Sequence, residues 1–110
     1  MLASDGGRLL SAESVRQLTR DRMTARDRAE NQIFLGDHSG WGLMMAVPAA
    51  DGSTGVPGVP GGFGWEGASG TVWRTDTSAG LTGILLTQRM TTSPEPTRLV
   101  RDFWAAPYAT

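Results

Sequence analysis

Apolar residues recur along the chain in short runs whose spacing changes from helical to strand-like. Near the N-terminus, Val15 and Leu18 lie at helical spacing, and Ser11 stands where an N-cap residue accepts a hydrogen bond from the first turn. Glu13 falls in that turn, where the helix dipole favours negative charge. The pattern predicts an amphipathic helix over residues 11–23. A polar loop is predicted over residues 24–40, which begin in a run of alternating Arg and Asp.

The middle of the chain has the pattern of short strands. An apolar run over residues 41–47 is bounded by Gly and Pro, and its length favours a strand over a helix. Residues 48–62 are rich in Gly and Pro and predict a loop, after which a strand is expected over residues 63–68. Residues 71–88 combine β-branched and aromatic alternation with a central turn and a second apolar run, which predicts a hairpin.

The last segment predicts a helix over residues 94–106. Ser93 would cap it and Pro94 would occupy its first turn, and one face would be apolar, with Leu99, Val100, Phe103 and Trp104. Helices at both ends of a run of strands indicate the α+β class, built on an antiparallel sheet. A length of 110 residues allows one domain at most.

Composition narrows the chemistry. The net charge is -1 with no long run of either sign, so nucleic acid is not the expected partner. All ten basic residues are Arg and there is no Cys, which excludes amine and thiol nucleophiles within this chain. The single His38 stands between Asp37 and Ser39, and we interpret it as a surface residue because sequence neighbours do not assemble a triad. No metal and no cofactor are expected.

The distribution of apolar residues also bears on location. No stretch approaches the roughly eighteen apolar residues of a membrane span, and the first residues lack the apolar core of a signal peptide. We therefore expect no membrane partner and, for the chain as written, a cytoplasmic location.

Two segments together resemble a known family. Residues 63–73 and 81–88 are similar to the end of class C-like β-lactamases, penicillin-binding proteins and related esterases. A helix like residues 7–15, a Trp-Gly-Leu strand like residues 41–43 and a terminal helix like residues 101–104 occur there in the same order. The chain thus resembles the C-terminal part of a β-lactamase-family serine hydrolase. In that family further strands come from the N-terminal part, so the resemblance implies a single partial domain, residues 1–110, with an incomplete sheet.

The resemblance also implies a site. Trp65-Glu66-Gly67 matches the third signature box of the family, on a strand that borders the substrate, so these three residues are expected to bind substrate. By the same match, the backbone N–H of Ala68 would be one of two oxyanion-hole donors. Glu66 could serve as an acid or base, but a single carboxylate without a partner is more often solvated.

The departures from the family pattern limit this expectation. The family's S-x-x-K box needs a Lys, which the chain lacks, and the only Tyr, Tyr108, lies near the C-terminus. The chain alone is therefore expected to be inactive, whereas the intact form would cleave an ester or amide, β-lactams included, through an acyl-enzyme. Trp65 in place of a cation favours neutral substrates.

Two alternatives stay open, and each implies different partners. The chain could be a non-catalytic interaction module, or a truncated product without a function of its own. The expected partners are the missing N-terminal part, a small ester or amide substrate, or a second copy bound through an open sheet edge. In the absence of that part, Phe103 and Trp104 are expected to lack packing partners.

Overall fold

The computed structural model describes residue 7 and residues 9–36, 39–49 and 62–109 of the 110-residue chain. Most of the predicted Gly/Pro loop over residues 48–62 lies outside these ranges. Asp37 and His38 also lie outside the described residues. The interpretation of His38 as a surface residue therefore stays a prediction.

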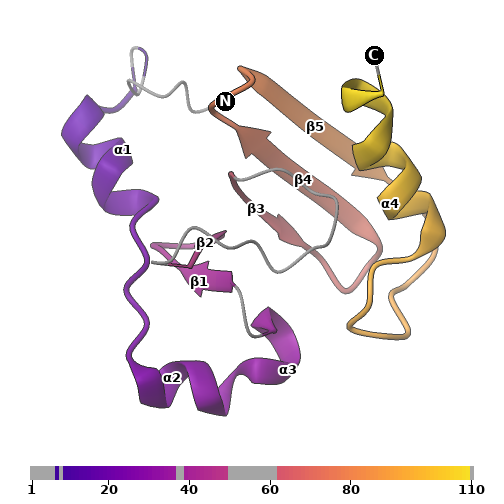
Figure 1. Ribbon diagram of the computed structural model, residues 1–110, viewed down its shortest axis with the longest axis horizontal. Helices are drawn as coiled ribbons and strands as arrows, with labels where there is room; N and C mark the ends of the chain where they lie inside the picture. Colours follow the sequence, from indigo (N-terminus) through magenta and orange to yellow (C-terminus); the bar gives the residue numbers. More distant parts are fainter. Residues whose placement is uncertain (1–6, 8, 37–38, 50–61, 110) are drawn as a thin grey trace.

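Five strands form one antiparallel sheet in which each strand pairs with the next one along the chain (Figure 1). They are β1 (Ser39–Trp41), β2 (Ala46–Pro48), β3 (Phe63–Glu66), β4 (Thr71–Asp76) and β5 (Leu81–Leu86). β4 and β5 pair along their whole length, whereas β2 and β3 meet at the single pair Ala46↔Gly64. This architecture confirms the α+β class and the antiparallel sheet.

Side chains alternate between the two faces of the sheet, and each face has its own core. On one face, the helix α4 (Arg98–Ala105) packs Trp104 against Val72, and Figure 1 shows the helix running beside β5. A Cβ on Gly83 would overlap the Trp104 ring, so glycine at this position allows the close approach. The opposite face carries a second cluster, which consists of Met45, Val47, Phe63 and Trp73.

The terminal helix corrects two expectations. It is capped by Thr97, whose Oγ1 accepts from the Val100 N–H, and it begins at Arg98, although the sequence suggested a start at Pro94. Glu95 precedes a proline, which disfavours the helical conformation there. Trp104 is 3% exposed and Phe103 packs beside it, so the expectation that both lack partners in this chain is wrong.

The predicted first helix is shorter than expected. Ser11 caps it as predicted, but α1 ends at Leu18 (Ala12–Leu18) and does not reach residue 23. The backbone beyond it bonds to the β1 segment: the Arg22 N–H donates to the Trp41 carbonyl at 2.9 Å, and the Leu43 N–H donates to the Leu18 carbonyl at 2.9 Å. These tertiary bonds satisfy groups that a longer helix would otherwise pair internally.

The predicted polar loop over residues 24–40 contains regular structure. It holds the helices α2 (Ala25–Glu30) and α3 (Gln32–Leu35) and the start of β1. α2 begins with a capping box in which Thr24 and Asp27 bond reciprocally. The Thr-x-x-Asp spacing of Thr24 and Asp27 is the sequence pattern that indicates this helix start, but the segment is so rich in charged residues that its composition indicates a loop.

The apolar run over residues 41–47 is a hairpin rather than one strand. β1 ends at Trp41 and β2 begins at Ala46, and between them the Gly42 N–H donates to the Met45 carbonyl at 2.9 Å. Met44 adopts a positive φ of 77° and is 86% exposed, so only Met45 of the Met pair packs in the core. A uniformly apolar run gave no local sign of the reversal.

The remaining strands follow the predicted order. The predicted strand 63–68 ends earlier, at Glu66 of β3, and the predicted hairpin 71–88 is present as β4 and β5.

Among the described residues, no helix is long and apolar enough to cross a membrane.

Candidate functional site

The segment that resembles the third signature box lies where β3 turns back into β4. The Gly67 N–H donates to the Thr71 carbonyl at 2.8 Å, and the Gly70 N–H donates to the Gly67 carbonyl at 2.9 Å. Gly70 has a φ of +82°, and a Cβ there would overlap the Arg89 carbonyl. Glycine is therefore required at this turn, which fixes the backbone around Ala68.

Ala68 lies exposed in this turn, and only its carbonyl group is hydrogen-bonded within the described structure. Its carbonyl accepts from the Thr91 N–H at 2.9 Å, and the neighbouring Gly67 carbonyl accepts from Thr91 Oγ1 at 3.4 Å. Within the part of the chain that the structure describes, no group accepts a hydrogen bond from the Ala68 N–H. The turn thus holds an exposed residue whose backbone donor is unpaired within the described structure.

Trp65 and Glu66 point to opposite faces of the sheet because they are adjacent in one strand. Glu66 pairs with Arg74 at 3.0 Å on the face that α4 covers; the Arg74 side chain is 5% exposed and the Glu66 side chain 31%. Among the described residues, Arg74 Nε is buried without a hydrogen-bond partner, so the ion pair with Glu66 is what offsets the burial of the guanidinium charge. Its contacts indicate a structural role for Glu66 rather than an acid or base.

Trp65 faces a hollow of about 380 Å³ between the α2–α3 segment and the sheet. The Trp65 ring meets Trp41 edge-to-face, with centroids 4.9 Å apart and planes at 88°. The lining residues are Arg22, Met23, Asp27, Asn31, Phe34, Leu35, Trp41, Gly42 and Trp65. Of the four predicted site residues, the structure brings only Trp65 to this hollow. Met23, Phe34 and Trp41 were missed because they converge only in the folded chain.

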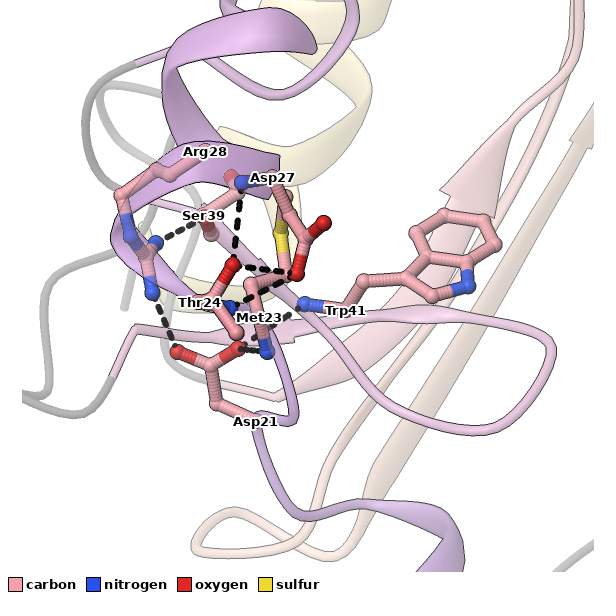
Figure 2. A network of polar contacts seen from close by, with 7 residues as sticks. All are labelled: Asp21, Met23, Thr24, Asp27, Arg28, Ser39 and Trp41. Atoms are coloured by element: carbon pink, nitrogen blue, oxygen red, sulfur yellow. Dashed lines mark hydrogen bonds and ion pairs between the residues drawn. The ribbon is translucent and has the colours of Figure 1, made fainter.

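A network of charge-assisted hydrogen bonds fixes the wall of the hollow formed by α2 and β1 (Figure 2). Arg28 donates through Nη2 to Asp21 Oδ2 at 2.6 Å and through Nη1 to the Ser39 carbonyl at 2.7 Å. Asp21 Oδ1 accepts from the backbone N–H groups of Met23 and Trp41 at 3.1 and 3.2 Å. One carboxylate therefore joins the segment after α1, the helix α2 and the strand β1.

The surroundings of Asp21 stabilise its ionised carboxylate and leave room for it. Burial would raise the pKa of Asp21, but the hydrogen bonds from Met23, Arg28 and Trp41 and the charge of Arg28 lower it overall. A Cβ on Gly40 would overlap the carboxylate, so glycine leaves room for it. The described residues contain no group of three His, Cys, Asp or Glu side chains that could hold a metal ion.

The chain is similar to two proteins of Mycobacterium tuberculosis. They are Uncharacterized protein MT1414 of strain CDC 1551 and Protein Rv1367c of strain H37Rv, each 42% identical over 91 residues. The alignment covers 76% of this chain and 22% of each relative, so the chain spans about a fifth of their length. Neither name states an activity. No protein-family model and no solved structure matches the chain.

Proposed function

We propose that this chain is the C-terminal segment of a β-lactamase-like serine hydrolase whose intact form cleaves a neutral ester or amide through an acyl-enzyme. One observation carries the proposal: the backbone N–H of the exposed residue Ala68 has no acceptor in the described structure, and Ala68 lies two residues beyond the strand that lines a hollow through Trp65. A positioned donor of this kind stabilises the oxyanion that develops during acyl transfer.

The chain's own residues supply binding and charge stabilisation but no activated nucleophile. Each oxyanion donor is worth about 3 kcal/mol in the transition state. Ser and Thr hydroxyls are weak nucleophiles unless a nearby base takes their proton, and this family uses Lys and Tyr for that purpose. The only Tyr here is engaged elsewhere, because the Tyr108 hydroxyl donates to Asp76 at 2.9 Å. The nucleophile and base would therefore come from a further part of the protein.

A chimera tests this function directly. This chain replaces the matching segment of Protein Rv1367c, and the product is assayed for turnover with 4-nitrophenyl acetate and for covalent labelling with a neutral fluorescent 4-nitrophenyl ester. We expect ester turnover and labelling of a Ser that lies outside this chain, whereas the chain alone should show neither. Labelling of a Ser within the isolated chain would contradict the proposal, as would a folded chimera that is inert towards both reagents.

Two variants of the chimera separate the roles of neighbouring residues. Ala68→Pro removes the donor N–H and should lower turnover by roughly 10²–10³-fold. Glu66→Gln should leave turnover nearly unchanged, because Glu66 points to the opposite face. Near-UV circular dichroism of both variants checks that the fold is kept. Equal turnover by a folded Ala68→Pro variant would rule out the oxyanion role.

A non-catalytic interaction module is the second candidate, and the free edge of the sheet favours it. β5 is the last strand of the sheet, and Ile84 and Leu86 are 62% and 75% exposed on it. An open edge with apolar side chains can bind another chain by strand addition. An inert chimera together with tight capture of an extended peptide along β5 would favour this alternative.

A further inference from the structure

The residues that line the hollow beside Trp65 indicate which kind of substrate group would bind there. We propose that it binds the bulky, aromatic side group of a neutral ester or amide substrate. This inference rests on the proposed function, because it assigns the hollow to the substrate of the same site.

The walls of the hollow are largely apolar and aromatic. Its volume of about 380 Å³ lies within the range of about 300–1,000 Å³ that is typical of small-molecule pockets. Trp41 and Trp65 stand at right angles in one wall, and Met23 and Leu35 add apolar surface. Phe34 lines the hollow yet is 73% exposed, so a large aromatic ring stays in water unless a ligand covers it.

The polar groups around the hollow are already engaged by the chain itself. Arg22 donates to the carbonyl and the side chain of Gln17, at 3.0 and 2.7 Å. Asp27 accepts from Thr24, and Asn31 donates to the Asp27 carbonyl at 2.8 Å. One cation and one carboxylate line the same space, so their charges offset each other. This balance favours a neutral ligand over an anion or a cation.

The hollow lies close along the backbone to the proposed oxyanion donor, although Ala68 itself does not line it. Trp65 and Ala68 are three residues apart, which corresponds to at most about 10 Å of extended chain. A side group seated against Trp65 would therefore leave the reacting carbonyl within reach of the Ala68 N–H if only a few bonds separate them. An aromatic amino acid ester or a phenylalkanoyl ester has that length.

The hollow is held in shape before any ligand arrives. The Asp21–Arg28–Ser39 network ties α2 to β1, and the Trp41 N–H in the same strand donates to Asp21 (Figure 2). A ligand that enters a pre-formed apolar site loses less affinity to ordering of the protein. Binding is therefore expected to be measurable in the 110-residue chain without the rest of the hydrolase.

Binding is tested with the full chain labelled with ¹⁵N, by following the indole N–H signals of the four Trp residues. The probe is N-acetyl-L-phenylalanine methyl ester, and the control ligand is N-acetylglycine methyl ester. We expect saturable shifts of the Trp41 and Trp65 signals with the first ester only, and a fixed signal for Trp104, which packs on the opposite face of the sheet. No saturable shift at millimolar probe, or equal shifts with both esters, would overturn the inference.

A matched pair of variants on α3 locates the site. Phe34→Ala should weaken probe binding about fivefold, which corresponds to about 1 kcal/mol of lost apolar contact. Ile33→Ala is the control, because Ile33 is 66% exposed on the same helix but does not line the hollow. Equal weakening of probe binding by both variants would refute the assignment.

The two proposals fail on different results, because binding of the probe needs no nucleophile. A chain that does not bind the probe, together with an active chimera, would refute this inference alone. An inert chimera together with intact probe binding would refute the hydrolase proposal alone.

Discussion

Met44 is the one described residue other than glycine with a positive φ, 77°, and it lies in the turn between β1 and β2. A side chain in this conformation brings Cβ close to the following carbonyl, which costs about 1–2 kcal/mol. The Met44 side chain is 86% exposed and adds little packing in return. The turn is therefore under strain that a residue without Cβ would relieve.

Replacing Met44 by Gly should stabilise the chain by about 1 kcal/mol, reduced by the extra backbone entropy of Gly in the unfolded state. Urea denaturation followed by Trp fluorescence measures the change. The control is Leu43→Gly, at an adjacent position without a positive φ, which should destabilise the chain. Destabilisation by Met44→Gly would show that the side chain contributes contacts that outweigh the strain.

The Asp76 carboxylate, at the end of β4, accepts several hydrogen bonds. Its Oδ1 accepts from the Ser78 hydroxyl at 2.6 Å and from the backbone N–H groups of Ser78 and Ala79, and Oδ2 accepts from Tyr108 at 2.9 Å. Burial would raise the pKa of Asp76, but these hydrogen bonds lower it overall. The raised pKa of Tyr108 follows from burial first and then from the Asp76 carboxylate.

These shifts predict how stability depends on pH. The pKa of Asp76 is lower in the folded chain than its ordinary value of 3.8, so its contribution is present above pH 3.8 and is lost as the pH falls through the folded value. Tyr108→Phe removes one donor and should weaken this acid dependence. Thermal melts between pH 2 and pH 7 measure it. An unchanged acid dependence in the variant would show that Tyr108 does not hold the carboxylate.

At the scale of elements, the sequence predicted those parts whose contacts are local. The hairpin at 71–88 was predictable because alternation and turn residues are adjacent in sequence, and Ser11 was predictable as a cap for the same reason. The end of α1 depends on backbone bonds between residues about twenty positions apart, whereas the β1–β2 reversal is closed by the local Gly42–Met45 bond inside an apolar run that gave no sign of a turn. Of the site, Trp65 was identified by resemblance, but its neighbours in the hollow come from α2, α3 and β1, which no local pattern joins.

Arg28 is expected to hold α2 against the sheet through its contacts with Asp21 and Ser39. Its planar guanidinium reaches Asp21 and the Ser39 carbonyl at once, and an ammonium cannot reproduce that fork. Arg28→Lys should destabilise the chain by about 1–2 kcal/mol and increase amide exchange across residues 25–35. Arg26→Lys is the control, since Arg26 pairs with Glu30 at an exposed position and should have little effect. Equal exchange in both variants would contradict a supporting role for Arg28.

For the whole molecule, the open edge at β5 sets the expected behaviour in solution. Ile84 and Leu86 project from the face opposite α4 and are mostly exposed, and among the strands that the structure describes, β5 has a neighbour on one side only. Unpaired edges with apolar side chains promote association. The 110-residue chain should therefore associate as its concentration rises.

Ile84→Lys should suppress this association, because a charge on an edge strand opposes pairing with another chain. Sedimentation velocity at several concentrations measures it. Met90→Lys is the control, since Met90 is 69% exposed but lies outside the strands. A wild-type chain that stays monomeric at high concentration, or equal suppression by both variants, would show that the β5 edge is not the contact.

The order of the strands has a consequence for how fast the chain folds. Every strand pairs with the next one in sequence, and only residues 77–80 separate β4 from β5. Closing such short loops loses little entropy, so this hairpin can form early and the other strands can add to it in turn. Refolding of the sheet should accordingly be fast for a β-rich chain, with the β4–β5 pair serving as its nucleus.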